Sequence, residues 1–313
     1  MAYPKRVEKQ DQTCLVTTRT AGSALWFVRV SSQLYEEILG YLAKYQQKYG
    51  VLIYSFPVMG NHYHLIAQFP GNNRAQFMRD FNSQVARVSK RHVVQIPSGP
   101  LWGDRFAAQS LDDDASIREY FFYCALQAIN SGLTERIEEY PGYNSLRDSL
   151  RGKPREHAVV NWKAYHNAKR FNPKVDIKRY TTWYPLEFTR LPGYEGLSQR
   201  DYREAVMTEV ERRRLAAVAE RKAAGGGFAG RAAILKTEVG ARPQSTKKRD
   251  RKNPQPISLA QDAQVREEAI QRYRAICAAH KEASKQYLAG DFDTVFPSGT
   301  YRPPLISAVT AVT

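Results

Sequence analysis

Two histidines separated by one residue, His62 and His64, have the spacing in this chain that is best suited to chemistry. They begin a mainly apolar run, residues 62–69, that is typical of a β-strand, and alternate side chains of a strand point to the same face. Two imidazoles side by side form half of a divalent-metal site. A pair of strand histidines that bind no metal would have the same pattern, so the rest of the site must decide between the two interpretations.

A tyrosine and a glutamine some 60 residues later have a matching arrangement. The segment 114–132 follows an acidic cluster, residues 112–114, and ends at Gly132, which are the signals of a helix start and a helix end. Tyr123 and Gln127 are one turn apart on this expected helix and therefore share a face. A phenol and an amide oxygen could then address the metal site together.

With these pieces in place, the chain resembles the HUH single-tyrosine transposases, and within them the REP-associated tyrosine transposases. The resemblance covers roughly residues 12–146 and rests on an ordered set: the first strand 15–19, the histidine segment 58–66, the basic helix 79–91, the Trp102 to Phe106 segment, the cluster 112–114 and the Tyr123 helix. Gly60 stands where the family usually has proline, and Gln127-Ala128 stands where this branch usually has Asn-Pro.

The resemblance implies a transposase that cleaves and rejoins single-stranded DNA. Its expected partners are hairpins at element ends or REP-like repeats, and its expected products are a five-prime phosphotyrosine and a free three-prime hydroxyl. It also implies Mg²⁺ or Mn²⁺ as cofactor, whereas imidazole ligands by themselves would equally suit zinc. It leaves open a monomer or a homodimer that exchanges the tyrosine helix.

The chemistry favours the same residues. A phosphotyrosine ester retains the free energy of the broken phosphodiester because phenol, with a pKa of about 10, is a competent leaving group. A metal held by His62, His64 and Gln127 would offset the charge that develops as the phenolic oxygen attacks. We therefore predict Tyr123 as the nucleophile and these three residues as ligands.

Three alternatives stay open at the level of sequence. Tyr120 is a rival nucleophile, although Cys124, one turn after it, is a poor ligand for a hard metal. A nucleic-acid-binding protein could keep this fold without cutting, in which case Tyr123 would be a core residue. A metal-dependent hydrolase could use water as nucleophile, but no additional carboxylate accompanies the histidines in the sequence.

Charge divides the chain into two parts. Residues 1–150 hold 16 Lys or Arg against 14 Asp or Glu, and residues 151–313 hold 31 against 17, so the second part carries nearly all of the net charge of +16. We expect a catalytic domain at 1–150 and, at 151–313, a basic DNA-binding accessory region with a flexible linker near 225–260. Basic segments favour polyanions through counterion release, although the run 242–256 is also typical of a solvated tail.

Composition favours a globular protein of the prokaryotic cytoplasm, associated with the nucleoid. The chain contains no long apolar run and no apolar segment near its start, so we expect neither a membrane span nor a secretory signal. Its three cysteines, Cys14, Cys124 and Cys277, are widely spaced and match neither a disulfide framework nor a zinc pattern.

The expected fold is α+β: a ferredoxin-like, mostly antiparallel sheet with helices on one face, followed by a basic, mainly helical C-terminal extension. We expect strands at 12–20, 24–30, 51–58, 62–69 and 103–111, and helices at 31–49, 73–92 and 114–132. In the extension, we expect helices at 198–223 and 261–289 that lie on the first domain or on DNA without a large core of their own.

Further residues are candidates for DNA contact. The candidates are Asn61, beside the histidines, Arg105, which we expect on a strand near the metal, and Arg87, Lys90 and Arg91 on the basic helix, together with Arg74 and the polar residues Asn82, Ser83 and Gln84. For Arg105 an ion pair with Asp112 or Asp114 is an equal alternative, and the helix face could simply be solvated. The segment 155–200, rich in aromatic and basic residues, could stack unpaired bases or cover the sheet.

Overall fold

The computed structural model describes residues 5–243 and 256–304. The elements in chain order are β1 (Gln12–Arg19), η1 (Ala21–Ser23), α1 (Ser32–Tyr49), β2 (Leu52–Ser55), β3 (His62–Phe69), α2 (Arg74–His92), β4 (Ala107–Ser110), α3 (Asp114–Ala125), α4 (Gln127–Asn130), η2 (Ile137–Glu139), α5 (Leu146–Ser149), β5 (Arg155–Val160), α6 (Trp162–Phe171), η3 (Ile177–Tyr180), β6 (Thr181–Leu186), α7 (Gln199–Ala223), α8 (Gly230–Lys236) and α9 (Ala263–Leu288). Most of the predicted basic run 242–256 lies outside the described residues.

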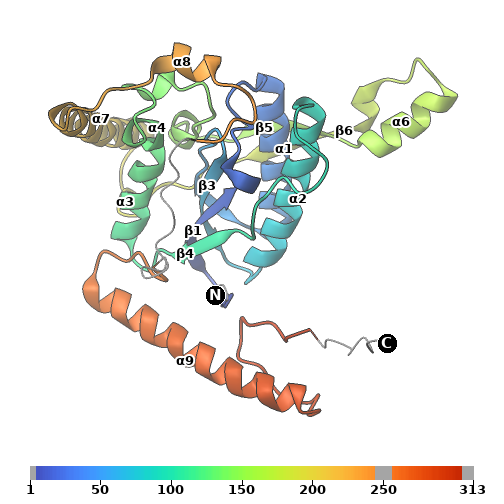
Figure 1. Cartoon of the computed structure of the whole chain (residues 1–313), viewed down its shortest axis with the longest axis vertical. Coiled ribbons are helices and arrows are strands. Elements are labelled where there is room, and N and C mark those ends of the chain that lie inside the picture. Colours follow the sequence, from blue (N-terminus) through green and yellow to red (C-terminus); the bar gives the residue numbers. More distant parts are fainter. Residues whose placement is uncertain (1–4, 244–255, 305–313) are drawn as a thin grey trace.

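An antiparallel sheet with the strand order β2-β3-β1-β4 forms the centre of the molecule. This confirms the predicted α+β class with an antiparallel sheet and a mainly helical extension. The prediction that helices cover only one face is wrong, because α1 and α2 cover one face and α3 covers the other (Figure 1). The reason is that the central strands are apolar on both sides: Val16 and Leu65 pack toward α1 and α2, whereas Leu15 and Ile66 pack toward α3.

The ends of the helices follow from local chemistry. The side chain of Ser31 accepts a hydrogen bond from the backbone N–H of Leu34 at the start of α1, and Gly50 ends that helix in the left-handed conformation with φ 63°. Asp113 caps α3 by accepting from the N–H of Ser116. The predicted helix 114–132 is interrupted at Leu126, which separates α3 from α4.

The predicted strand at 24–30 is wrong. Phe27 and Val28 are buried, but the backbone there bonds to loops: Leu25 N–H donates to the carbonyl of Ala241, and Phe27 N–H donates to that of Gly60. β1 already pairs with β3 on one side and with β4 on the other, so no ladder position beside it is open. The predicted strand 103–111 shortens to β4, which leaves Arg105 just before the strand.

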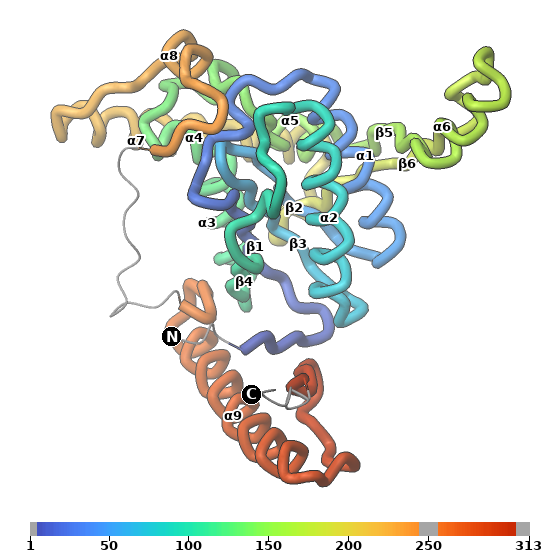
Figure 2. The backbone as a smooth tube through the Cα atoms, turned by 45° about the vertical axis from the view of Figure 1, so that its right-hand side comes forward, coloured from blue at the N-terminus to red at the C-terminus, as the bar shows by residue number. Residues whose placement is uncertain are grey.

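The extension contains elements of two kinds. α7 lies on the α3 side of the sheet and buries Tyr202, Val206, Val210 and Val218 against the same core as α3. Residues 155–186 instead form the hairpin β5-β6, which packs on α1 and carries α6 at its tip, projecting from the body (Figure 2). α8 falls within the predicted linker 225–260, and α9 lies beyond the β4 edge of the sheet.

The approach of the hairpin to α1 depends on one glycine. A Cβ atom at Gly40 of α1 would lie 2.6 Å from the carbonyl oxygen of Ala158 in β5. Only a residue without a side chain allows the strand to pass so close to the helix. His157 adds a polar tie, since its Nδ1 lies 2.9 Å from the Glu36 carboxylate on α1.

Candidate metal and tyrosine site

Strand β3 places His62 and His64 side by side on the face of the sheet that α3 covers. Their ring centroids are 4.9 Å apart. The antiparallel register sets Arg19 of β1 opposite His62 and Thr17 opposite His64. The spacing argument from sequence is thus confirmed, because both rings point to one face.

Each histidine uses its Nδ1 atom in a hydrogen bond. His62 Nδ1 lies 2.7 Å from Asn61 Oδ1, and the Asn61 amide is oriented because its Nδ2 donates to the carbonyl of Ser23 at 2.9 Å. An amide oxygen can only accept, so His62 carries its proton on Nδ1 and keeps a lone pair on Nε2. His64 Nδ1 lies 2.8 Å from Thr17 Oγ1.

Burial keeps both imidazoles neutral. It lowers the pKa of His64 to about 4, with a further contribution from the positive charge of Arg19. Burial also lowers the pKa of His62 well below its ordinary value, and the charges of His64 and Arg19 act in the same direction. A neutral imidazole is the form that binds a metal ion.

Helix α3 brings Tyr123 to this pair. Its ring lies 5.9 Å from that of His64, measured between centroids, and its side chain is 37% exposed. Burial raises the pKa of Tyr123, as does the neighbouring thiol of Cys124, whereas a hydrogen bond from Gln127 and the charge of Arg19 lower it. The phenol is thus accessible from outside. Its pKa is raised overall, and Gln127 and Arg19 are the neighbours that act in favour of the ionised form.

The donor set fits a divalent cation. His64 Nε2 and Gln127 Oε1 are buried, and neither has a hydrogen-bond partner in the part of the chain that the structure describes. Leaving a buried polar atom unpaired costs about 1–3 kcal/mol, so a ligand for both atoms would stabilise the site. Within the described ranges there is no cluster of three or more His, Cys, Asp or Glu side chains suited to a metal, so an amide ligand would be required.

Arg19 is a site residue that the sequence reasoning missed. It stands at the end of β1, opposite His62 in the register, and its charge acts on His62, His64 and Tyr123. The signal available in the sequence was its place at the end of the first strand. Recognising it needed the strand pairing, which brings β1 next to β3.

The rival Tyr120 contacts Tyr123 on the same helix. Its ring packs 5.8 Å from that of Tyr123 and against the core beneath α3. Burial raises its pKa, with a smaller contribution from Tyr123. The geometry therefore favours Tyr123.

The other predicted DNA contacts lie in different places. Asn61 is buried and orients His62. Arg87, Lys90 and Arg91 belong to α2, across the sheet from the histidines, where Arg91 pairs with Glu37 and lies over the Trp162 ring. DNA contact by these side chains stays a prediction.

The structure also places two further candidates, of which Arg105 stays a prediction. Arg74 is buried and bonds to Gln12, Cys14 and the carbonyl of Val7, so it is a structural residue. Arg105 lines a cavity beside β4, and the carboxylate of Asp112 accepts hydrogen bonds from Ser110 and Ser258.

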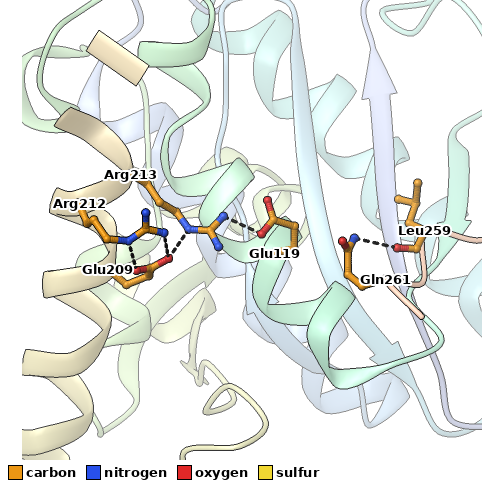
Figure 3. Close-up of polar contacts among 6 residues, drawn as sticks. All are labelled: Glu119, Glu209, Arg212, Arg213, Leu259 and Gln261. Carbon is orange, nitrogen blue, oxygen red and sulfur yellow. Dashed lines mark hydrogen bonds and ion pairs between the residues drawn. The ribbon is translucent and has the colours of Figure 1, made fainter. Parts of the chain in front are cut away.

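The tyrosine helix is held in place from outside by α7. Arg213 of α7 donates to Glu119 of α3 at 2.7 Å and to Glu209 of its own helix at 2.6 Å, and Arg212 also donates to Glu209 (Figure 3). The Arg213 guanidinium lies 4.7 Å from the centroid of the Phe122 ring. The helix that carries Tyr123 is therefore packed between the sheet and the extension.

One family model matches a segment of the chain that contains part of this site. Residues 28–123 match the family model described as "Transposase IS200 like". That segment is IS200-transposase-like. It contains His62, His64 and Tyr123, and it ends before Gln127, so the resemblance inferred from the sequence is confirmed for this segment.

Among solved structures, one similar chain is "Structure of the REP associates tyrosine transposase bound to a REP hairpin". It is 17% identical, with a TM-score of 0.41, and the match covers 49% of this chain and 87% of that chain. No curated protein matches the chain. Within the described residues, no helix is both long and apolar enough to cross a membrane.

Proposed function

We propose that this protein cleaves and rejoins single-stranded DNA that carries hairpins, through a covalent bond between Tyr123 and the DNA. The observation that carries the proposal is that Tyr123 contacts both His64 and Gln127. Each of these two neighbours has a buried atom without a hydrogen-bond partner in the described residues, Nε2 of His64 and Oε1 of Gln127. The IS200-like match over these histidines and this tyrosine supports it.

In each direction, the proposed reaction exchanges one phosphate ester bond for another. The phenolic oxygen of Tyr123 attacks the scissile phosphorus as its proton leaves toward solvent, and the bond from phosphorus to the three-prime oxygen breaks. The three-prime oxygen takes up a proton to become a hydroxyl, and the five-prime phosphate remains on the tyrosine. Attack by a three-prime hydroxyl on that phosphotyrosine restores a phosphodiester and releases the phenol, so neither direction needs ATP.

His62, His64 and Gln127 would hold the divalent cation, Mg²⁺ or Mn²⁺. When bound, the cation would neutralise charge on the non-bridging phosphate oxygens. Asn61 and Thr17 orient the imidazoles that hold it. Arg19, whose charge lowers the pKa of Tyr123, is placed to favour the phenolate and to hold a phosphate oxygen.

The hairpin arm, residues 155–186, is the proposed accessory DNA contact. α6 has no buried residue, and residues 161–180 hold six Lys or Arg against one acidic residue. Phe171 is 91% exposed and Trp183 62% exposed on this projection. Exposed aromatic rings among cations are the features that bind nucleic-acid strands.

The test is a covalent-adduct assay. Labelled single-stranded hairpin DNA is incubated with the protein and Mn²⁺ and resolved on a denaturing protein gel. We expect a labelled adduct with the unchanged protein and with Tyr120→Phe, and none with Tyr123→Phe, which should still bind the DNA.

Each other outcome rejects part of the proposal. An adduct that survives in Tyr123→Phe and disappears in Tyr120→Phe would make Tyr120 the nucleophile. Free DNA fragments without any adduct would indicate a hydrolase that uses water. Intact DNA that is bound but never cut, with Mg²⁺ and Mn²⁺ both supplied, would indicate a binding protein.

A further inference from the structure

A large cavity lies between the β4 edge of the sheet and α9. Its volume is about 1170 Å³, and its walls come from residues 5–12, the segment 103–112 that includes β4, and one face of α9. α9 contributes Ala269, Arg272, Tyr273 and Ile276, whose spacing of three and four places them along a single face. We call this space the α9 cavity.

The α9 cavity reaches the candidate site. Thr17 and Arg19 line it, and these are the residues that contact His64 and act on Tyr123. A molecule that fills the cavity would therefore extend to the catalytic groups. Its volume exceeds the roughly 300–1,000 Å³ of typical small-molecule sites, so a longer chain is the better fit.

The lining is cationic. Seven Lys or Arg side chains line the cavity against three Asp or Glu, and two of these carboxylates are already engaged, Glu8 with the N–H of Ala75 and Asp112 with Ser110 and Ser258. Burial and the nearby charge of Arg105 lower the pKa of Arg6, and Arg6 Nε is buried without a partner in the described residues. Cations brought this close together favour a bound polyanion.

Aromatic rings accompany these cations. The Arg6 guanidinium lies 4.4 Å from the centroid of the Phe106 ring, and Tyr273 of α9 lines the cavity. Base stacking on aromatic side chains within a positive groove is the general mode by which unpaired strands bind, and it needs no particular sequence. A small inorganic anion would make no use of these rings.

α9 is tied to the body near both ends. At its start, Asp262 N–H donates to Asp113 at 2.9 Å, next to the hydrogen bond from Ser258 to Asp112. Further along, Lys5 Nζ lies 2.6 Å from His280 Nδ1. The cavity is thus a passage covered by a helix, which suits one strand rather than a duplex. Residues 5–12 and α9 lie outside the IS200-like segment.

We propose that the α9 cavity holds single-stranded DNA, with phosphates against Arg6 and Arg272 and bases against Phe106 and Tyr273. The inference rests on the proposed function, since the strand held there would be the one that Tyr123 attacks. α9 would then hold the nucleotides beside the scissile phosphate while the reaction proceeds.

Two arginines on α9 allow a matched test. Arg272 lines the cavity, whereas Arg274, two residues further and likewise exposed, points away from it. In the Tyr123→Phe background, which should form no adduct, Arg272→Glu and Arg274→Glu are compared for binding of a labelled single strand by fluorescence anisotropy over a range of salt concentrations. Both variants change the net charge equally, so any difference in DNA affinity comes from the position of the arginine relative to the cavity.

We expect Arg272→Glu to weaken binding about tenfold relative to Arg274→Glu, the loss of one charged hydrogen bond. The slope of log K against log salt should also fall in magnitude by about 0.7, the value for one phosphate contact on a single strand. The difference should vanish with a fully paired duplex of the same sequence. Equal binding by the two variants, or a larger difference on the duplex, would overturn the proposal.

The adduct assay on the chain with Tyr123 intact separates this inference from the proposed function. Adduct formation together with equal binding by the two arginine variants would reject the α9 cavity alone. No adduct, together with weaker binding by Arg272→Glu, would reject the proposed chemistry and leave a strand-binding cavity.

Discussion

At the scale of single residues, the candidate site contains residues that orient the proposed ligands as well as the ligands themselves. Asn61 holds the proton of His62 on Nδ1, and Thr17 contacts Nδ1 of His64. In the proposed function, the two Nε2 atoms would be the ones that bind the metal. Gln127 supplies an oxygen with no partner of its own in the described residues. In the proposed function, the short His-x-His motif would therefore depend on a set of oriented neighbours.

Asn61→Ala should weaken Mn²⁺ binding about 10–100-fold, the usual cost of removing an outer-shell partner of a metal-bound histidine. The expected reason is loss of the hydrogen bond that fixes the His62 ring and tautomer. Titration calorimetry with Mn²⁺ on the DNA-free protein measures it directly.

The control for that measurement is Gln68→Ala on the same strand, which should leave Mn²⁺ affinity unchanged, since Gln68 bonds to the carbonyl of Asp11. Unchanged affinity in Asn61→Ala would show that Asn61 does not orient a ligand. Loss of binding in His64→Ala is the companion result that assigns the metal to this pair.

At the scale of elements, the β5-α6-β6 arm is an addition to the four-stranded sheet. It packs through β5 and β6 on α1, where Gly40 permits the close contact, and projects α6 with no buried side chain. Its cations and exposed rings cannot be explained by core packing. Arg91 of α2 lies over Trp162 at its base, which joins the predicted basic helix to this surface.

We expect the double variant Lys169→Glu/Arg170→Glu to weaken binding of hairpin DNA and to reduce the salt dependence of binding, because cations of α6 would no longer displace counterions from phosphate. Unfolding temperature should stay unchanged, since both side chains are exposed. Anisotropy with labelled hairpin DNA at several salt concentrations provides the readout.

Arg200→Glu/Arg203→Glu on exposed positions of α7 is the control with the same change in charge. A loss of affinity as large in this control as in the α6 variant would mean that only net charge matters, and would remove the arm from the DNA-binding surface.

At the scale of the whole molecule, the extension packs on the part of the chain that holds the candidate site. α7 shares a core with α3, the helix that carries Tyr123, and Arg213 links the two helices through Glu119. α9 and residues 5–12 form the covered cavity that leads to Arg19. The basic half of the chain is thus built onto the site that it would supply with DNA.

Val206→Asp should therefore destabilise the whole protein, with a cost of about 3–5 kcal/mol for an uncompensated charge in the shared core. Unfolding followed by circular dichroism should show one transition at lower denaturant concentration, because α7 and α3 lose their packing together. Leu215→Asp, on the same helix but 54% exposed, should change stability little. An unaffected midpoint in Val206→Asp would show that α7 is not part of this core.

The sequence by itself determined the local features. The alternation of a strand put His62 and His64 on one face, because that periodicity is a property of the backbone. The spacing of four residues also indicated that Tyr123 and Gln127 are neighbours, and they remain hydrogen-bonded although the predicted helix breaks at Leu126 between them. The antiparallel class, the acidic start of α3 and the positions of α7 and α9 followed from patterns of the same kind.

Only the tertiary structure decided which distant segments meet. The strand register brought Arg19 to the candidate site. Both edges of β1 are paired, with β3 and with β4, so a strand at 24–30 could not join the sheet beside it. Helices cover both faces of the sheet and not the one face that we predicted. The α9 cavity joins residues 5–12 to α9 across more than 250 positions of sequence. Such contacts depend on the sum of many weak packing energies over the whole chain, which no local spacing encodes.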